Sequence, residues 1–145
     1  ISAQLLRHRS FSFQEFSQRY AEVDGLGDPI FPALRRQDLT NRQNSIDDIG
    51  VNCQAEWFIQ IASLYNQTSS LYKQMLKAGI AKECAREILP LASPTRLYMN
   101  GTLRSWIHYV ELRTGNGTQK EHRDIALEIQ QLIKQNYPQT YEALS

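Results

Sequence analysis

The feature that most constrains the fold is a long apolar repeat in the middle of the chain. Between residues 54 and 78, apolar side chains recur with a period close to 3.6 residues, which places them on one face of an α-helix. Gly79 follows where a helix commonly ends, because glycine adopts a left-handed backbone conformation at little cost. We therefore predict one long helix here. The residues that carry the period are Trp57, Ile61, Leu64, Tyr65, Leu71, Tyr72 and Met75.

Three further helices are predicted downstream. Residues 80–89 carry small and apolar side chains on one face and stop before a proline, and residues 102–113 repeat the helical period. The pair Thr118 and Glu121 has the spacing of a capping box, so it predicts the start of a last helix that ends near Pro138.

The remaining segments predict extended or irregular structure. Residues 1–8 are too few to distinguish helix from strand, residues 9–20 favour an ordered segment that becomes extended, and residues 95–101 are typical of a strand. Residues 24–53 are rich in Gly, Pro, Asn and Asp and predict a long surface excursion. The predicted class is α+β, mostly helical with a small antiparallel sheet, in a single domain over residues 1–145.

Composition excludes several classes of protein. The 145 residues include 41% hydrophobic residues and carry a net charge of +1, so the chain should form a packed core. The balanced charge argues against a general binder of nucleic acids or membrane surfaces. No apolar run approaches the roughly 20 residues that span a bilayer. We expect a cytoplasmic protein in which Cys53 and Cys84 are reduced, with Cys84 an inert thiol on a buried helix face.

Common cofactor motifs do not occur. Gly25 and Gly27 begin a dinucleotide fingerprint, but Ile30 stands where its third glycine belongs. The chain has three histidines, and none has metal-ligand spacing to another histidine or to a cysteine, so we predict no metal site.

Arginine is concentrated near the start of the chain. Arg7, Arg9 and Arg19 lie close to Ser17, with one nearby acid, Glu15. Guanidinium groups hold phosphate through two parallel hydrogen bonds, and serine hydroxyls donate to the same oxygens. The segment therefore fits a nucleotide phosphate, although a solvated, charged surface strand would show the same composition.

An ordered set of motifs narrows the choice. Arg7, His8 and Arg9, followed by seven residues and Ser17, form the RHR-x7-S signature, and the chain resembles flavin-dependent thymidylate synthases. The similarity continues through later blocks in the same order, and the last block resembles the version in viral and cyanobacterial-type members. These blocks are residues 14–20, 83–86, 89–91, 104–109, 112–113 and 116–122.

The resemblance implies reductive methylation of dUMP to dTMP. Methylenetetrahydrofolate would donate the carbon, FAD would carry electrons and NADPH would supply them. The family's enzymes are homotetramers of mostly helical α+β subunits whose active sites draw on more than one subunit. Its members are longer than this chain, which begins with Ile1 just ahead of the signature, so we expect the chain to be the C-terminal two thirds of a subunit.

The resemblance also implies roles for individual residues. Arg113 aligns with an arginine that stabilises negative charge on the pyrimidine, which makes it the predicted catalytic residue. Ser17 is expected to donate to phosphate rather than act as a nucleophile, because no neighbouring base is evident. The predicted dUMP site is Gln4, Arg7, Glu15, Ser17, Arg19, Arg86 and Arg113, with Arg86 from a neighbouring subunit. The predicted FAD site is Arg7, His8, Arg9, Glu15, Thr102, Arg104 and His108.

Two other interpretations stay open at this point. One is a non-catalytic helical module that binds nucleotides or RNA and uses Arg7, Arg9 and Arg19 as a phosphate clamp. The other is a fragment without activity whose aromatic-rich helices serve subunit packing. Bound flavin would distinguish the synthase from both.

Overall fold

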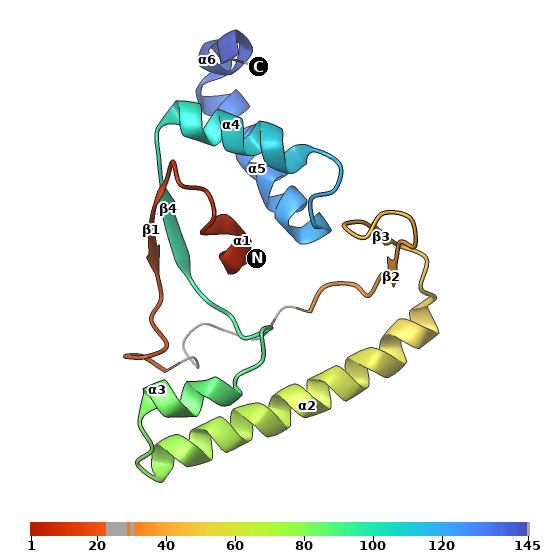
Figure 1. Cartoon of the computed structure of the whole chain (residues 1–145), viewed down its shortest axis with the longest axis vertical. Coiled ribbons are helices and arrows are strands. Elements are labelled where there is room, and N and C mark those ends of the chain that lie inside the picture. The colour runs from red at the N-terminus through yellow and green to blue at the C-terminus, as the bar shows by residue number, and fades with distance from the viewer. Residues whose placement is uncertain (23–28, 30, 145) are drawn as a thin grey trace. The chain divides into compact units, whose positions relative to one another are not determined.

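The computed structural model describes residues 1–22, 29 and 31–144. The chain divides into two compact units. The first comprises residues 1–14, 37–46 and 98–145, and the second comprises residues 15–36 and 47–97. Figure 1 labels all the elements except η2, and in chain order they are α1 (Ser2–Leu5), β1 (Ser12–Glu15), β2 (Arg36–Gln37), β3 (Ser45–Ile46), α2 (Val51–Lys77), α3 (Lys82–Ala85), η2 (Arg86–Ile88), β4 (Leu97–Asn100), α4 (Leu103–Thr114), α5 (Lys120–Asn136) and α6 (Pro138–Leu144).

The mostly helical α+β class is confirmed, and most predicted segments have the predicted type. The strand predicted within 95–101 is β4, and the segment 9–20 contains β1. Residues 1–8, left open between helix and strand, contain the four-residue helix α1. Of the predicted excursion 24–53, positions 24–28 and 30 lie outside the described residues, and its last residues already belong to α2, which begins at Val51.

The second unit is built on α2. The helix runs for 27 residues and ends where predicted, since Gly79 follows it with a φ of 82°. The short helices α3 and η2 pack against it (Figure 1). Cys84 on α3 is exposed, so the prediction of a buried thiol is wrong. Only one residue of this short helix, Ala85, is fully buried, because a four-residue helix presents too little surface to bury a whole face.

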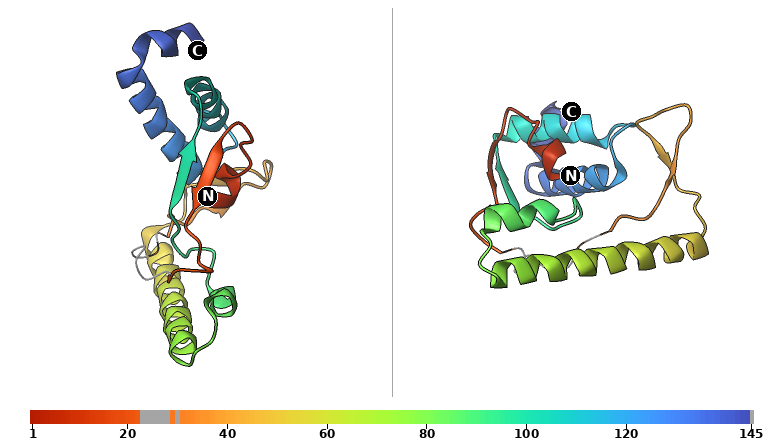
Figure 2. Two further views of the ribbon diagram at one scale, coloured as in Figure 1. Left: turned by 90° about the vertical axis from the view of Figure 1, so that its left-hand side faces the viewer. Right: turned by 60° about the horizontal axis from the view of Figure 1, so that its bottom comes forward.

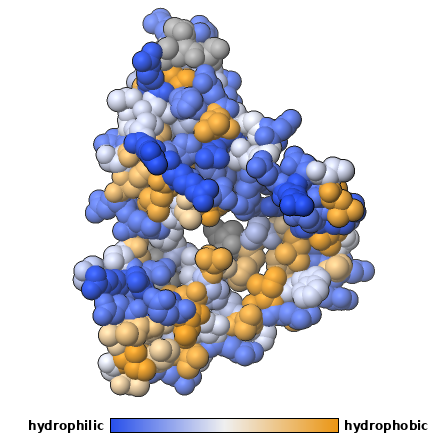
Figure 3. Space-filling model, in the orientation of Figure 1, coloured by the Kyte–Doolittle hydropathy of each residue, from blue (hydrophilic) through white to orange (hydrophobic). Residues whose placement is uncertain are grey.

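The surface of α2 is unusually apolar for an exposed helix. Tyr72 is the one fully buried residue of this helix, whereas Val51, Ile59 and Leu64 are 81%, 70% and 64% exposed. Figure 3 shows apolar patches along this helix, which runs across the lower part of the view. The predicted periodicity is therefore present, but much of the apolar surface of the helix faces outward in this chain.

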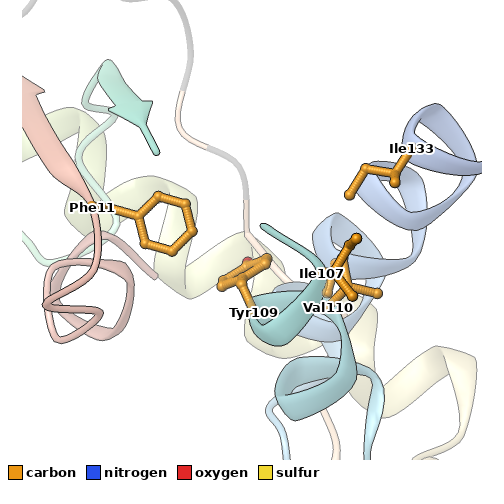
Figure 4. Close-up of a cluster of buried hydrophobic side chains, with 6 residues drawn as sticks. Phe11, Ile107, Tyr109, Val110 and Ile133 are labelled. Carbon is orange, nitrogen blue, oxygen red and sulfur yellow. The ribbon is translucent and has the colours of Figure 1, made fainter. Parts of the chain in front are cut away.

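The first unit contains the hydrophobic core. Helices α4 and α5 pack against each other, and Ile107 and Val110 of α4 meet Ile133 of α5 (Figure 4). Phe11, from the turn before β1, and Tyr109 complete the labelled cluster. The apolar faces of these two helices thus form one shared interior.

Strands β1 and β4 form a two-stranded antiparallel sheet that leads into α4, and they lie side by side in Figure 1 and in the left panel of Figure 2. Gly101 follows β4 and lies against the ring of Phe11. A Cβ atom at position 101 would come within 2.5 Å of that ring, so the close packing of the sheet end requires glycine there.

A second small sheet, β2 with β3, encloses a polar turn. The Asp38 carboxylate accepts hydrogen bonds from the backbone N–H groups of Thr40 and Asn41 and from the side chain of Asn44. These donors, with Asn41 the largest contributor, hold the pKa of Asp38 well below its usual range. The turn is ordered by its own side chains. None of the described helices combines the length and apolar character needed to cross a membrane.

Candidate active site

The signature segment of residues 7–9 lies between α1 and β1, and its central residue faces inward. The His8 ring is half-buried and packs edge-on against Tyr109, with ring centroids 4.9 Å apart. Arg113, in the last turn of α4, donates from Nε to His8 Nε2 at 2.9 Å. A histidine nitrogen that accepts from a guanidinium carries no proton, so this contact requires a neutral His8. Burial, followed by the charge of Arg113 and that of His108, lowers the His8 pKa.

A buried polar chain lies beside this contact. His122 on α5 is fully buried, its Nδ1 lies 3.0 Å from Gln4 Oε1, and its Nε2 lies 3.0 Å from the Tyr109 hydroxyl. Burial, followed by the charge of Arg113, lowers the pKa of His122 to about 4. Burial raises the pKa of Tyr109 to about 12. Both side chains are therefore neutral near pH 7.

The prediction that Thr118 caps α5 is wrong. The residue at the N-cap position is instead part of the hydrogen-bonded network that contains Gln4 and His122. The N-cap is Gln119, whose side chain accepts from Gln4 Nε2 at 2.7 Å and donates to Glu121 at 2.9 Å. Glu121 therefore interacts with the Gln119 side chain rather than completing a capping box with Thr118.

Other predicted residues of the first unit lie at its surface. Arg7, Arg9, Arg104 and His108 are exposed. Thr102 is the N-cap of α4, and its hydroxyl accepts from the Ser105 backbone N–H at 3.2 Å. Thr102 therefore has a structural role that the sequence analysis did not assign to it.

The second unit holds the remaining predicted dUMP residues. Arg19 donates from Nε to the Glu83 carboxylate at 2.8 Å, and Arg86 forms an ion pair with Glu87 at 3.5 Å. The Glu15 carboxylate accepts from the Thr95 hydroxyl at 3.1 Å. The exposed residue Ser17 lies in the turn after β1, where its carbonyl accepts from the backbone N–H groups of residues 20 and 21.

The structure brings three predicted residues of the first unit into one network. His8 is joined directly to Arg113, and Gln4 reaches the same cluster through His122 and Tyr109.

The sequence analysis assigned no role to His122 or Tyr109. A signal for His122 was present, since it shares the buried stripe of α5 with Ala126 and Ile133 at helical spacing. A polar residue in such a stripe indicates a buried hydrogen-bonded group.

An apolar cavity of about 680 Å³ lies elsewhere in the first unit, between α4 and α5. Trp106, Ile129, Ile133 and Tyr137 contribute to its walls. None of the predicted site residues lines this cavity, so the cavity is not part of the predicted site.

Comparison with known proteins identifies the family. A family model described as "Thymidylate synthase complementing protein" matches residues 1–139. The chain belongs to this family. The resemblance carried by the RHR-x7-S signature and the later blocks is therefore confirmed across nearly the whole chain.

Two relatives within the family are about half identical to the chain. A probable flavin-dependent thymidylate synthase of Paramecium bursaria Chlorella virus 1 is 52% identical over 144 residues, and the flavin-dependent thymidylate synthase of Synechocystis sp. is 50% identical over 145 residues. Each match covers 99% of this chain and 66% of the relative. The chain thus spans just under two thirds of their length.

Solved structures agree with the family fold. A UMP/dUMP methylase, PolB from Streptomyces cacaoi, bound with 5-Br dUMP superimposes with a TM-score of 0.83 at 26% identity, over 98% of this chain and 64% of that chain. The same methylase bound with 5-Br UMP gives a TM-score of 0.86.

Proposed function

We propose that the protein containing this chain is a flavin-dependent thymidylate synthase that methylates dUMP to dTMP. The observation that carries the proposal is the hydrogen bond between Arg113 and His8, which joins two family motif blocks 105 residues apart in sequence. The relatives at 52% and 50% identity bear the same functional name.

The proposed nucleotide site uses the cations and acids of the signature region. Ser17 and Arg19 hold the dUMP phosphate, because a hydroxyl and a guanidinium donate to the same oxygens. Gln4, Arg7, Glu15 and Arg86 complete the contacts to dUMP. Arg19 contacts the Glu83 carboxylate in this structure, so phosphate binding would exchange a carboxylate for a phosphate at this side chain.

We expect three exposed arginines of the first unit to bind the diphosphate of FAD. Among the described residues, Arg7, Arg9 and Arg104 make no ion pair or side-chain hydrogen bond, and all three are exposed. With His8, Glu15, Thr102 and His108 they would hold the cofactor. FAD, when bound, supplies the redox chemistry, reduced by NADPH and with methylenetetrahydrofolate as carbon donor.

Arg113 is the proposed catalytic residue. Uracil C5 is a weak nucleophile, and negative charge develops on the pyrimidine as C5 becomes nucleophilic. A fixed guanidinium stabilises that charge where it forms. The bond to His8 Nε2 restricts the rotation of the guanidinium, so part of the orientation is present before substrate binds.

We also propose a homotetramer in the cytoplasm. The apolar side chains exposed along α2 support self-association, because exposed apolar patches of this kind mark protein interfaces.

A visible spectrum of the purified protein tests the proposed function. We expect a bound oxidised flavin whose absorption changes when dUMP is added. A colourless protein that does not respond to dUMP would contradict the proposal. Steep salt dependence of oligonucleotide binding without flavin would instead favour the RNA-binding alternative, and a colourless monomer would favour a packing fragment.

A further inference from the structure

Five polar side chains form one continuous hydrogen-bonded chain in the first unit. Glu121 accepts from Gln119, Gln119 accepts from Gln4, and Gln4 faces His122, which in turn faces the hydroxyl of Tyr109. The four donor to acceptor distances are 2.9, 2.7, 3.0 and 3.0 Å. His122 and Tyr109 are fully buried, so their polar groups depend on these partners.

The carboxylate of Glu121 determines which group donates in each hydrogen bond of this network. A carboxylate only accepts, so Gln119 must turn its NH₂ group toward Glu121 and its oxygen toward Gln4. Gln4 must then present its NH₂ group to Gln119 and its oxygen to His122. His122 Nδ1 therefore carries the proton, Nε2 accepts, and the Tyr109 hydroxyl donates.

We propose that His122 is a positioning residue that holds the Gln4 amide in one orientation, and that Glu121 fixes this orientation through Gln119. The substrate part of this inference rests on the proposed function, because there Gln4 contacts dUMP. Nothing in the chemistry of Gln4 itself would otherwise distinguish its two amide orientations, which have the same shape and exchange a donor for an acceptor.

Tyr109 links His122 to the signature segment, because it contacts both His122 and His8. It packs at 4.9 Å from the His8 ring, and its hydroxyl is held by His122. His122 thus contacts one side chain that would touch dUMP and one that supports the histidine bonded to Arg113. It touches neither ligand itself in this proposal, so its role is positional.

The first experiment reads the tautomer of His122 directly by nitrogen NMR of protein labelled with ¹⁵N-histidine. The chain has three histidines, so single substitutions assign the signals. We expect a neutral His122 ring at pH 7 with the proton on Nδ1. In Glu121→Gln, whose side chain can donate as well as accept, we expect a second population with the proton on Nε2.

The matched control is Asp124→Asn, which removes one negative charge from the same region of α5. Asp124 is exposed and pairs with Lys120 at 3.2 Å outside the polar chain, so the His122 tautomer should not change. A wild-type ring protonated on Nε2, or a Glu121→Gln spectrum identical to wild type, overturns the proposal. This measurement does not depend on dUMP binding.

The second experiment measures the dissociation constant of dUMP. His122→Asn keeps a side-chain N–H group near the position of Nδ1, so we expect its affinity for dUMP to stay within about threefold of wild type. His122→Leu removes the donor and should weaken binding about tenfold, as expected for one lost hydrogen bond. Circular dichroism checks that both variants fold.

The outcomes separate the two proposals. If wild-type protein binds neither flavin nor dUMP, the proposed function fails while the tautomer result still stands. If wild type binds dUMP and His122→Leu folds and binds equally well, the positioning role is wrong. If His122→Leu does not fold, Glu121→Gln supplies the affinity test, with a several-fold loss expected and an unchanged value contradicting the proposal.

Discussion

At the scale of single residues, the proposed site depends on side chains that fix one another. Arg113 Nε donates to His8 Nε2, so this bond requires the neutral imidazole. His122 is neutral for a different reason, because burial lowers its pKa. The motif analysis predicted His8 and Arg113 as ligand contacts, and the structure shows that they also contact each other. A substitution at Arg113 therefore changes two groups.

Replacing Arg113 tests the catalytic assignment. We expect Arg113→Ala to lower kcat by about 10²-fold or more, because it removes a charge that acts mainly in the transition state. The dissociation constant of dUMP should rise by less than about tenfold. Steady-state kinetics and dUMP titration give the two values. Arg123→Ala, an exposed position on α5, is the control. Equal losses in turnover and binding would show uniform ground-state binding instead.

The pH dependence of stability tests the burial of His122. Its pKa is about 4 in the folded state and near 6.5 when unfolded, so the unfolded chain binds more protons between these values. Stability from this group is complete above pH 6.5 and is lost as pH falls toward 4, by about 3 kcal/mol. Urea unfolding at several pH values measures this, and His122→Asn should show a shallower slope. Parallel slopes in the two proteins would count against a neutral, buried His122.

At the scale of elements, α4 is delimited by close packing at one end and by an open turn at the other. Gly101 precedes its cap, Thr102, and lies against Phe11. Gly115 follows its last residue with a φ of −69°, a value open to any residue. The two glycines flank the same helix, yet only the first is required by packing.

We therefore expect Gly101→Ala to destabilise the protein by about 1–3 kcal/mol, because the added methyl group displaces the Phe11 ring from the core. Gly115→Ala meets only an ordinary contact at 3.7 Å and should leave the free energy of unfolding unchanged within about 1 kcal/mol. Urea denaturation compares the two variants. Similar effects at both positions would mean that the contact with Phe11 is not the cause.

The cap of α4 gives a second test at this scale. Thr102→Ala removes the hydroxyl that accepts from Ser105 and should cost about 1 kcal/mol. Thr102→Asn keeps a capping group and should cost little. Flavin binding is also proposed for Thr102, so flavin retention is measured together with unfolding. If Thr102→Ala loses flavin but keeps its stability, the role of Thr102 is in cofactor binding alone.

At the scale of the whole molecule, the two units distribute apolar surface differently. The described core cluster belongs to the first unit, whereas α2 in the second unit exposes several large apolar side chains. A 27-residue helix with such a surface gains stability when another surface covers it. Self-association is the covering that the proposed homotetramer would provide.

Ile59→Glu tests whether α2 forms a subunit interface. The Ile59 side chain is 70% exposed, so the substitution should leave the helical content of the subunit unchanged. If α2 forms a subunit interface, a buried charge there should weaken association by about 30-fold or more, roughly 2 kcal/mol. Analytical ultracentrifugation measures the assembly state, with the exposed neighbouring position Gln60→Glu as control. An assembly unaffected by Ile59→Glu would exclude this part of α2 from the interface.

Local patterns in the sequence determined the helices and the family. Periodic apolar residues and the stop signals at Gly79 and Pro138 specify elements through neighbours a few residues away, so α2, α4 and α5 could be predicted with small errors at their ends. The ordered motif blocks identified the family and its candidate residues for the same reason, since they are read directly from residue types.

Only the tertiary structure decided which side chains meet. Gln4 and Gln119 lie 115 positions apart, and the burial of His122 and the exposure of Cys84 depend on what packs over each helix face. Periodicity shows which side chains share one face of a helix, but it does not show which other residues pack against that face. The polar chain through His122 arises from long-range packing, which no local pattern specifies.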